Sequence, residues 1–102
     1  MPVYHIVLFK LKSGVDKEQL DNFAATARSM VGKIPGLLDF QVGPGLAVTA
    51  HRAKGYDMGL VATLEKVEDV TSYGLHPAHQ ETHRLREDLC DETLAFDFEF
   101  SG

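Results

Sequence analysis

Residues 3–11 read Val3-Tyr4-His5-Ile6-Val7-Leu8-Phe9-Lys10-Leu11, and this stretch decides the fold. It is nearly all apolar and rich in Val, Ile, Leu and Phe, which predicts a strand that is buried on both faces. Successive side chains of a strand point to opposite faces, so Tyr4, Ile6 and Leu8 share one of them. If helices cover the other face, this apolar face needs a separate partner.

A helix is predicted to begin after the strand of residues 3–11 and the short turn that follows it. Asp16 and Gln19 have the spacing of a capping box, in which each side chain bonds the other's backbone N–H. The helix is expected to end at Pro35-Gly36. Its apolar residues recur at helical spacing and define one buried stripe. They are Leu20, Phe23, Ala27, Met30, Val31 and Ile34.

Two extended segments follow this helix. Leu38, Phe40 and Val42 alternate with polar residues and predict a half-buried strand that stops at Gly43-Pro44-Gly45. Residues 47–55 have loop character. Residues 56–64 alternate again, with one face formed by Tyr56, Met58, Leu60, Ala62 and Leu64.

The sequence of the last third of the chain predicts two helices followed by a strand. Residues 67–73 are predicted to form a short helix that breaks before His76-Pro77. Pro77 suits the first turn of the next helix, because the N–H that proline lacks would be unbonded there anyway. That helix places Ala78, Thr82, Leu85 and Leu89 on one face. Residues 94–100, with their alternating phenylalanines, predict a final strand.

This order of elements predicts an α+β fold of the ferredoxin-like βαββαβ type, in which a four-stranded antiparallel sheet carries its helices on one face. We expect one domain over residues 1–102. The face with Tyr4, Ile6 and Leu8 remains uncovered in such a monomer. A second copy packed sheet against sheet would bury it, so we expect a homodimer of the dimeric α/β-barrel kind.

The composition of the chain limits its expected partners and its cellular location. The chain has 10 basic and 15 acidic residues, a formal charge of −5, and shows no basic stripe, which argues against a nucleic-acid partner. Its single cysteine, Cys90, excludes an internal disulfide and fits a reducing compartment. No apolar run approaches the roughly 20 residues of a spanning helix. The N-terminus resembles no secretory leader, so we expect a cytoplasmic protein without a membrane partner.

Three histidines, His76, His79 and His83, lie within eight residues of the chain. His79 and His83 share a helix face, which suggests a metal site. The zinc-protease pattern, however, requires a glutamate where Gln80 stands, and no cysteine pair is near. We therefore expect no metal and no other cofactor, and expect His83 to be solvated or paired with an acidic neighbour.

His79 borders the apolar stripe of its helix, and Tyr73 precedes it across the break at Pro77. His5 shares a strand face with Val7 and Phe9. A histidine and a tyrosine beside an apolar cavity can act as proton acceptor and oxyanion donor in carbanion chemistry next to a carbonyl. The alternative is that both side chains bond the backbone and close the helix junction. The residues alone leave both interpretations open.

Several motifs together resemble the stress-responsive A/B barrel family from about residue 3 to residue 99. They are residues 5–12 (HIVLFKLK), Pro35-Gly36, Gly55-Tyr56-Asp57, His76-Pro77-Ala78-His79 and Phe96-Asp97-Phe98. The resemblance implies the same ferredoxin-like subunit and dimeric barrel. Many members of this family are known only as stress-associated proteins without a demonstrated reaction, so a non-catalytic role in stress response or structure is one expectation for this chain.

One plant member of the family performs a cofactor-free aldol cyclisation of a linear polyketide, with a histidine base and a tyrosine partner. The resemblance places these roles on His79 and Tyr73. It implies a pocket for a small hydrophobic substrate whose lining residues are His5, Val7, Phe9, Phe23, Leu60 and Ala62. Ala27, Thr93 and Ala95 differ in size or type from the corresponding residues of that enzyme, so the pocket would have a different shape. The resemblance thus implies a cyclase or lyase but no particular substrate.

Overall fold

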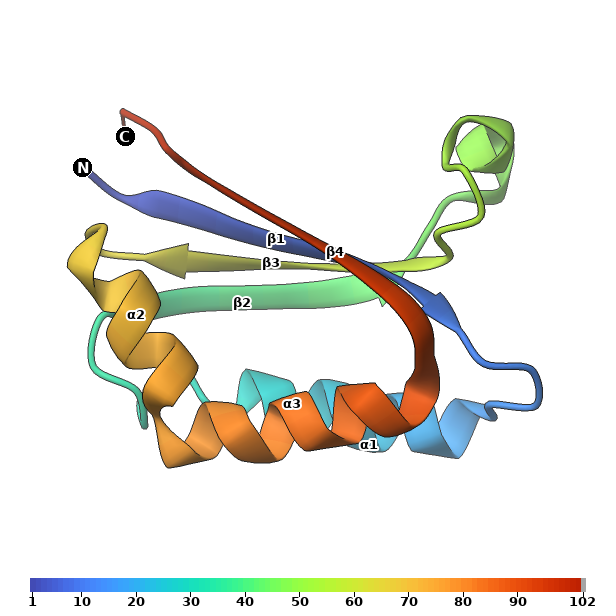
Figure 1. The fold of residues 1–102 in the computed structure, drawn as a ribbon, viewed down its shortest axis with the longest axis horizontal. Helices are drawn as coiled ribbons and strands as arrows, with labels where there is room; N and C mark the ends of the chain where they lie inside the picture. Colours follow the sequence, from blue (N-terminus) through green and yellow to red (C-terminus); the bar gives the residue numbers. More distant parts are fainter. Residues whose placement is uncertain (102) are drawn as a thin grey trace.

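Every strand of the sheet runs antiparallel to its neighbours, in the order β2-β3-β1-β4. The computed structural model describes residues 1–101. Its strands are β1 (Val3–Leu11), β2 (Leu37–Pro44), β3 (Met58–Leu64) and β4 (Cys90–Glu99), and its helices are α1 (Lys17–Arg28), the 3₁₀ helix η1 (Ala47–Arg52), α2 (Glu68–Leu75) and α3 (Pro77–Leu89). The three α-helices lie along one side of the sheet, as Figure 1 shows. The predicted ferredoxin-like α+β fold is confirmed.

β1 lies in the middle of the sheet and supplies the centre of the hydrophobic core. Val7 and Phe9 are almost fully buried beneath the helices. The ring of Phe9 packs edge to face against Phe23 of α1, with ring centroids 5.8 Å apart. The inward face of β1 is therefore the surface on which the helices are assembled.

Among residues 1–101, no helix combines the length and the apolar character needed to cross a membrane.

α1 begins as predicted and ends earlier. The capping box is present, because Gln19 N donates to Asp16 Oδ1 at 2.8 Å and Asp16 N donates to Gln19 Oε1 at 3.0 Å. The helix stops at Arg28, and tighter turns replace it up to Pro35. Those turns still bury Met30 but leave Val31 38% exposed, so the prediction of one helical stripe up to the Pro-Gly pair is wrong there.

The strand boundaries differ from the prediction at three ends. The register shifts between Leu37 and Asp39, and this bulge turns Leu37 into the core while Leu38 is 54% exposed. β3 begins at Met58 rather than Tyr56. β4 begins at Cys90, directly after α3, and not at Leu94. An alternating pattern cannot reveal a bulge, because the extra residue reverses which side chains face the core.

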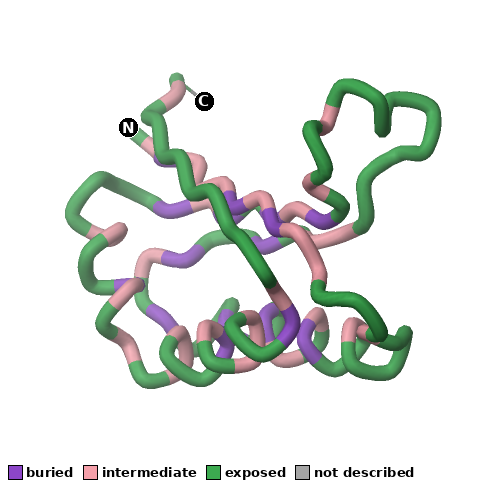
Figure 2. Tube along the Cα trace, turned by 45° about the vertical axis from the view of Figure 1, so that its right-hand side comes forward, coloured by how far each residue is buried: buried purple, intermediate pink, exposed green. Residues whose placement is uncertain are grey.

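The outer face of the sheet carries apolar side chains that no helix covers. Directly opposite residues of paired strands share a face, so Ile6 groups with its partners Val61 and Phe96. Phe96 is 62% exposed and Val61 is 36% exposed. Figure 2 shows that β4 is exposed along nearly its whole length. The uncovered apolar face predicted from residues 3–11 is therefore present.

Gly36, in the turn before β2, illustrates how tightly α2 approaches the sheet edge. Its φ is +86°, and a Cβ placed there would overlap the carboxyl group of Asp69 in α2. Gly32 has a similar φ of +94°, but a Cβ there would meet nothing within 4 Å. The two glycines share the left-handed conformation and differ in the space around them.

We predict that Gly36→Ala lowers the free energy of unfolding by about 2–4 kcal/mol, because it adds overpacking against Asp69 to the backbone strain. Gly32→Ala carries the strain alone and should cost about 1–2 kcal/mol. Urea unfolding of both variants beside the parent protein measures the difference. Equal losses would show that the contact with Asp69 relaxes without cost.

Candidate functional site

Three aromatic rings from three different elements meet under the sheet. Tyr73 of α2 packs against His5 of β1, with ring centroids 5.4 Å apart, and against His79 of α3, with centroids 4.5 Å apart. We call His5, Tyr73 and His79 the ring cluster. His5 points to the helix-covered side, as predicted from its place beside Val7 and Phe9 in β1. The structure thus brings together the three polar residues that the sequence singled out.

The junction between α2 and α3 fixes His79 in place. His76 caps α3 by accepting a hydrogen bond from Ala78 N at 3.0 Å, and Pro77 occupies the first turn. The carbonyl of Gly74 at the end of α2 has no continuing helix to bond it, and it accepts from Gln80 Nε2 at 2.7 Å and from His79 Nδ1 at 3.2 Å. The break in the helix therefore sets the orientation of the His79 ring.

This contact also determines which nitrogen of His79 can accept a proton. A carbonyl oxygen only accepts hydrogen bonds, so Nδ1 carries the hydrogen and the neutral ring leaves the Nε2 lone pair free. Burial lowers the pKa of His79, the bond to Gly74 opposes this, and the charges of His83, Arg86 and His5 lower the pKa further. The lowered pKa favours the neutral ring of His79, the form that can accept a proton.

Tyr73 is suited to the complementary role. The residue is only 3% exposed, and burial raises the pKa of its phenol to about 12, against a small opposing effect of Arg86. The hydroxyl thus keeps its proton at neutral pH and can donate a hydrogen bond. A buried donor aimed at a developing negative charge is the element that an oxyanion site requires.

The inward side of β4 is exposed opposite the helices α2 and α3, and we call this exposed strip, together with the two cavities beside it, the groove. Thr93, Ala95 and Asp97 pair with Phe9, Val7 and His5 of β1, so they point to the helix-covered side of the sheet. All three are nevertheless exposed. The helices therefore do not cover the inward face of β4.

Cavities lie at both ends of this groove. One of about 450 Å³ lies between Val70 of α2 and Asp97 of β4. The other, of about 120 Å³, lies between His83 of α3 and Thr93 of β4. Each has one lining residue that contacts the ring cluster, because His5 bonds Asp97 and the ring of His79 lies 5.9 Å from that of His83. The cavity predicted directly at Tyr73 and His79 stays a prediction.

Two polar residues of the groove were not recognised as site residues from the sequence. Asp97 accepts a hydrogen bond from Nδ1 of His5, and only the pairing of β1 with β4 brings them together. Arg86 donates to His83 Nδ1 at 2.8 Å, while its Nε is buried without a partner among the described residues. His83 also contacts Glu87 at 2.7 Å, the acidic pairing expected for it.

The remaining predicted site residues lie in the core. Val7, Phe9, Phe23, Leu60 and Ala62 are each at most 3% exposed, so their contact with a substrate stays a prediction.

Within residues 1–101, no group of three or more His, Cys, Asp and Glu side chains is placed to hold a metal ion. Burial raises the pKa of Cys90 to about 11, which keeps it a thiol rather than a nucleophilic thiolate.

The chain is a ferredoxin-like α+β protein, in which helices cover one face of a four-stranded antiparallel sheet. The family model of the stress responsive A/B barrel domain matches residues 3–100. The chain belongs to this family.

Two curated relatives match almost the whole chain. Olivetolic acid cyclase of Cannabis sativa is 28% identical over 98 residues, which cover 96% of each protein. The stress-response A/B barrel domain-containing protein HS1 of Arabidopsis thaliana is 28% identical over 97 residues, covering 95% of this chain and 88% of HS1.

Solved structures share the fold. The protein At3g17210 of Arabidopsis thaliana has a TM-score of 0.88 at 26% identity, over 98% of this chain and 96% of the other. Hydroxynitrile lyase from Passiflora edulis has a TM-score of 0.87 at 21% identity, over 98% and 94%. A dimeric ferredoxin-like protein of unknown function from Thermobifida fusca has a TM-score of 0.84 at 24% identity, over 98% and 92%.

The lowered pKa of His79 predicts a pH-dependent stability. The unfolded chain binds this proton more readily than the folded protein, so the free energy of unfolding should fall as pH drops below about 6.5 and through the lower folded pKa. His79→Gln should remove this part of the acid destabilisation. Urea midpoints from about pH 7.5 to about pH 5 test it. His51→Gln, on exposed η1, is the control, and an unchanged pH slope in His79→Gln would contradict the assignment.

Proposed function

We propose that this chain is a homodimeric small-molecule-binding protein and a cofactor-independent lyase or cyclase that acts on an apolar, polyketide-like carbonyl compound. One observation carries the proposal: the Nδ1–H of His79 is held by the Gly74 carbonyl, which leaves Nε2 free on a ring whose centroid lies 4.5 Å from that of Tyr73. The names of the cyclase and lyase relatives support the reaction class.

In the proposed reaction the substrate enters the groove between β4 and the helices. Nε2 of His79 removes a proton from the carbon next to a carbonyl group, and Tyr73 donates its hydroxyl hydrogen bond to the enolate oxygen that forms. The carbanion then attacks a second carbonyl of the same molecule, as in an aldol closure, and the alkoxide that forms takes back the proton from Nε2 of His79. His5, oriented by Asp97, would be a polar contact of the pocket, and the buried apolar residues around Phe9 would form its floor.

The dimer part of the proposal rests on the outer face. Ile6, Val61 and Phe96 form an apolar row across three strands, and a second copy on a two-fold axis would bury it. The ferredoxin-like protein of Thermobifida fusca, which is dimeric, supports self-association.

A second candidate is a non-catalytic role in stress response. The burial of Tyr73, which is only 3% exposed, favours this candidate, because a phenol packed in the core can simply close the helix junction. The name of the HS1 relative also supports it. The two candidates differ in what the ring cluster contributes, turnover or stability.

The enzyme proposal predicts a specific pattern of variants. His79→Ala should lower kcat by about 2–4 orders of magnitude, the scale of a general base, with ligand binding largely kept. Tyr73→Phe should lose less, because it removes one hydrogen bond to the developing charge. Turnover of linear polyketide-like substrates by the parent protein should also fall as pH drops through the lowered pKa of His79.

The controls separate catalysis from folding. His51→Ala, in the exposed η1, should keep full turnover. Thermal melts of His79→Ala and Tyr73→Phe show whether activity is lost from folded protein. If both variants lose about 1–3 kcal/mol of stability and no polyketide-like ligand shifts the melt of the parent protein, the stress-response candidate replaces the enzyme.

For the dimer, sedimentation at micromolar concentration should give a mass near twice that of the 11.3 kDa chain. Phe96→Asp should shift it to the monomer mass, because a charge would have to be buried in the apolar interface. Leu75→Asp, at a site 74% exposed at the end of α2, is the matched control and should remain dimeric. A monomeric parent protein would refute the two-fold arrangement.

A further inference from the structure

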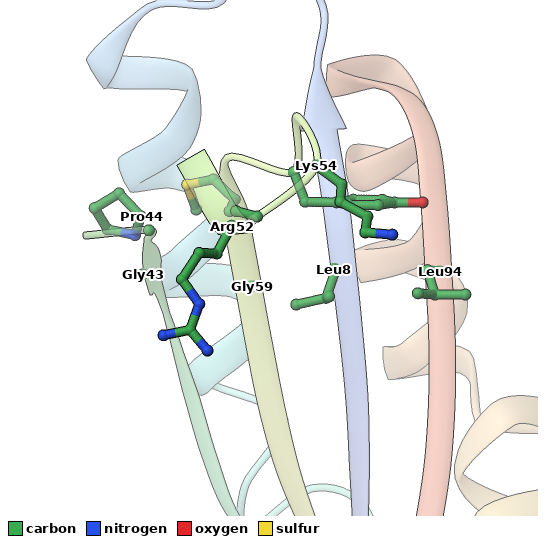
Figure 3. Close-up of a pocket in the computed structure, with 11 residues that line it drawn as sticks. Leu8, Gly43, Pro44, Arg52, Lys54, Gly59 and Leu94 are labelled. Atoms are coloured by element: carbon green, nitrogen blue, oxygen red, sulfur yellow. The ribbon is translucent and has the colours of Figure 1, made fainter. Parts of the chain in front are cut away.

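A cavity of about 390 Å³ lies at one end of the outer face of the sheet, beside the loop that carries η1 (Figure 3). It is separate from the groove, because β1 and its neighbours lie between it and the helices. Its wall is largely apolar and includes Leu8, Pro44 and Leu94. Its volume is within the usual range for small-molecule sites, about 300–1,000 Å³.

The cavity arises from the sequence of one row across the sheet. Leu94 pairs with Leu8, Leu8 with Gly59, and Gly59 with Gly43, so these four residues lie side by side on the outer face. Two of the four have no side chain, and the sheet is therefore hollow beside two leucines. A Cβ added at Gly43 would meet nothing within 4 Å, whereas one at Gly59 would lie 3.2 Å from a side-chain carbon of Leu8. The open space of the hollow is thus over Gly43.

Two cations lie at the edge of this hollow. Arg52 and Lys54 both line the cavity, and both are exposed. In Figure 3 the Arg52 side chain extends over the β2–β3 side and that of Lys54 over the β1–β4 side, with Leu8 between them. Among the described residues neither cation has an acidic partner within 4 Å. Glu92 is already engaged by Lys10 at 3.3 Å and by the Tyr56 hydroxyl at 2.8 Å.

The loop backbone supports a role for Lys54. Its φ is +55°, and it is the one residue other than glycine with a positive φ among residues 1–101. A left-handed conformation is strained for a residue with a side chain, and such strain is concentrated at binding and active sites. Here it holds a lysine, rather than a glycine, at the edge of an apolar hollow.

We propose that this cavity binds an amphiphilic monocarboxylate, a compound with an alkyl chain and one carboxylate. The chain lies in the hollow over Gly43, against Leu8 and Leu94. The carboxylate lies at the rim, where Arg52 and Lys54 supply the positive charge that attracts it. A polar sugar fits less well, because most of the lining offers no hydrogen-bonding partner.

The site does not depend on the proposed catalysis, since none of its residues belongs to the ring cluster or the groove. It does share Leu8 and Leu94 with the outer face. The alternative occupant is therefore a side chain of the second copy in the dimer, and the experiment must distinguish the two.

Titration calorimetry of the full chain with decanoate should show saturable binding, with decanol at least about ten-fold weaker and decylammonium weaker still. Raising the salt from about 0.05 to about 0.5 M should weaken decanoate and leave decanol unchanged. Amide chemical shifts should locate decanoate at Gly43, Gly59 and Leu94, not at Tyr73 and His79. Shifts confined to the ring cluster would overturn the assignment.

Variants test both parts of the site. Arg52→Gln and Lys54→Gln should each weaken decanoate by about five-fold, the scale of one exposed charge contact, while Lys33→Gln, an exposed lysine in the turn after α1, should not. Gly43→Leu should fill the hollow and weaken both decanoate and decanol at least about ten-fold. Parent-like decanoate binding in the Arg52→Gln/Lys54→Gln double variant would overturn the proposal. So would a Gly43→Leu variant that loses the dimer but still binds decanoate.

Discussion

The rest of the structure depends on the two-sided pairing of β1. This strand lies between β3 and β4, and its Val7 and Phe9 are almost completely buried under the helices. A buried strand must satisfy its backbone on both edges, and β1 does so with two antiparallel neighbours that come from distant parts of the chain. The position of His5 relative to Asp97 follows directly from that register.

Burial has the same electrostatic effect on both members of the candidate site, with complementary results. It favours the neutral form of each group. For His79 this lowers the pKa and leaves a free base, whereas for Tyr73 it raises the pKa to about 12 and preserves a hydrogen-bond donor. Burial thus favours a free base and a donor at the same pH, and the charge of Arg86 lowers the pKa of both groups. The Gly74 carbonyl adds the orientation.

β4 connects the two surfaces that we assign to binding. The helices cover the inward faces of the other three strands, and β4 remains exposed on both faces (Figure 2). Its inward residues, such as Ala95 and Asp97, border the groove beside the ring cluster. Its outward residues, such as Phe96, belong to the apolar face proposed for the second subunit. One uncovered strand thus lies between a proposed substrate site and a proposed interface.

The sequence by itself determined the order of the elements, the capping of α1, the start of α3 at Pro77 and the two faces of β1. These features depend on side-chain periodicity and on local hydrogen bonds between residues a few positions apart. The sequence also singled out His5, Tyr73 and His79 as the polar residues of interest. Only the tertiary structure decided the bulge at Leu37–Asp39, the early end of α1, and the pairing of His5 with Asp97. It also formed the hollow from Gly59 and Gly43, which are 16 residues apart and become neighbours only through strand register. Contacts of this kind leave no periodic trace in the chain, because they depend on how whole strands are placed against one another.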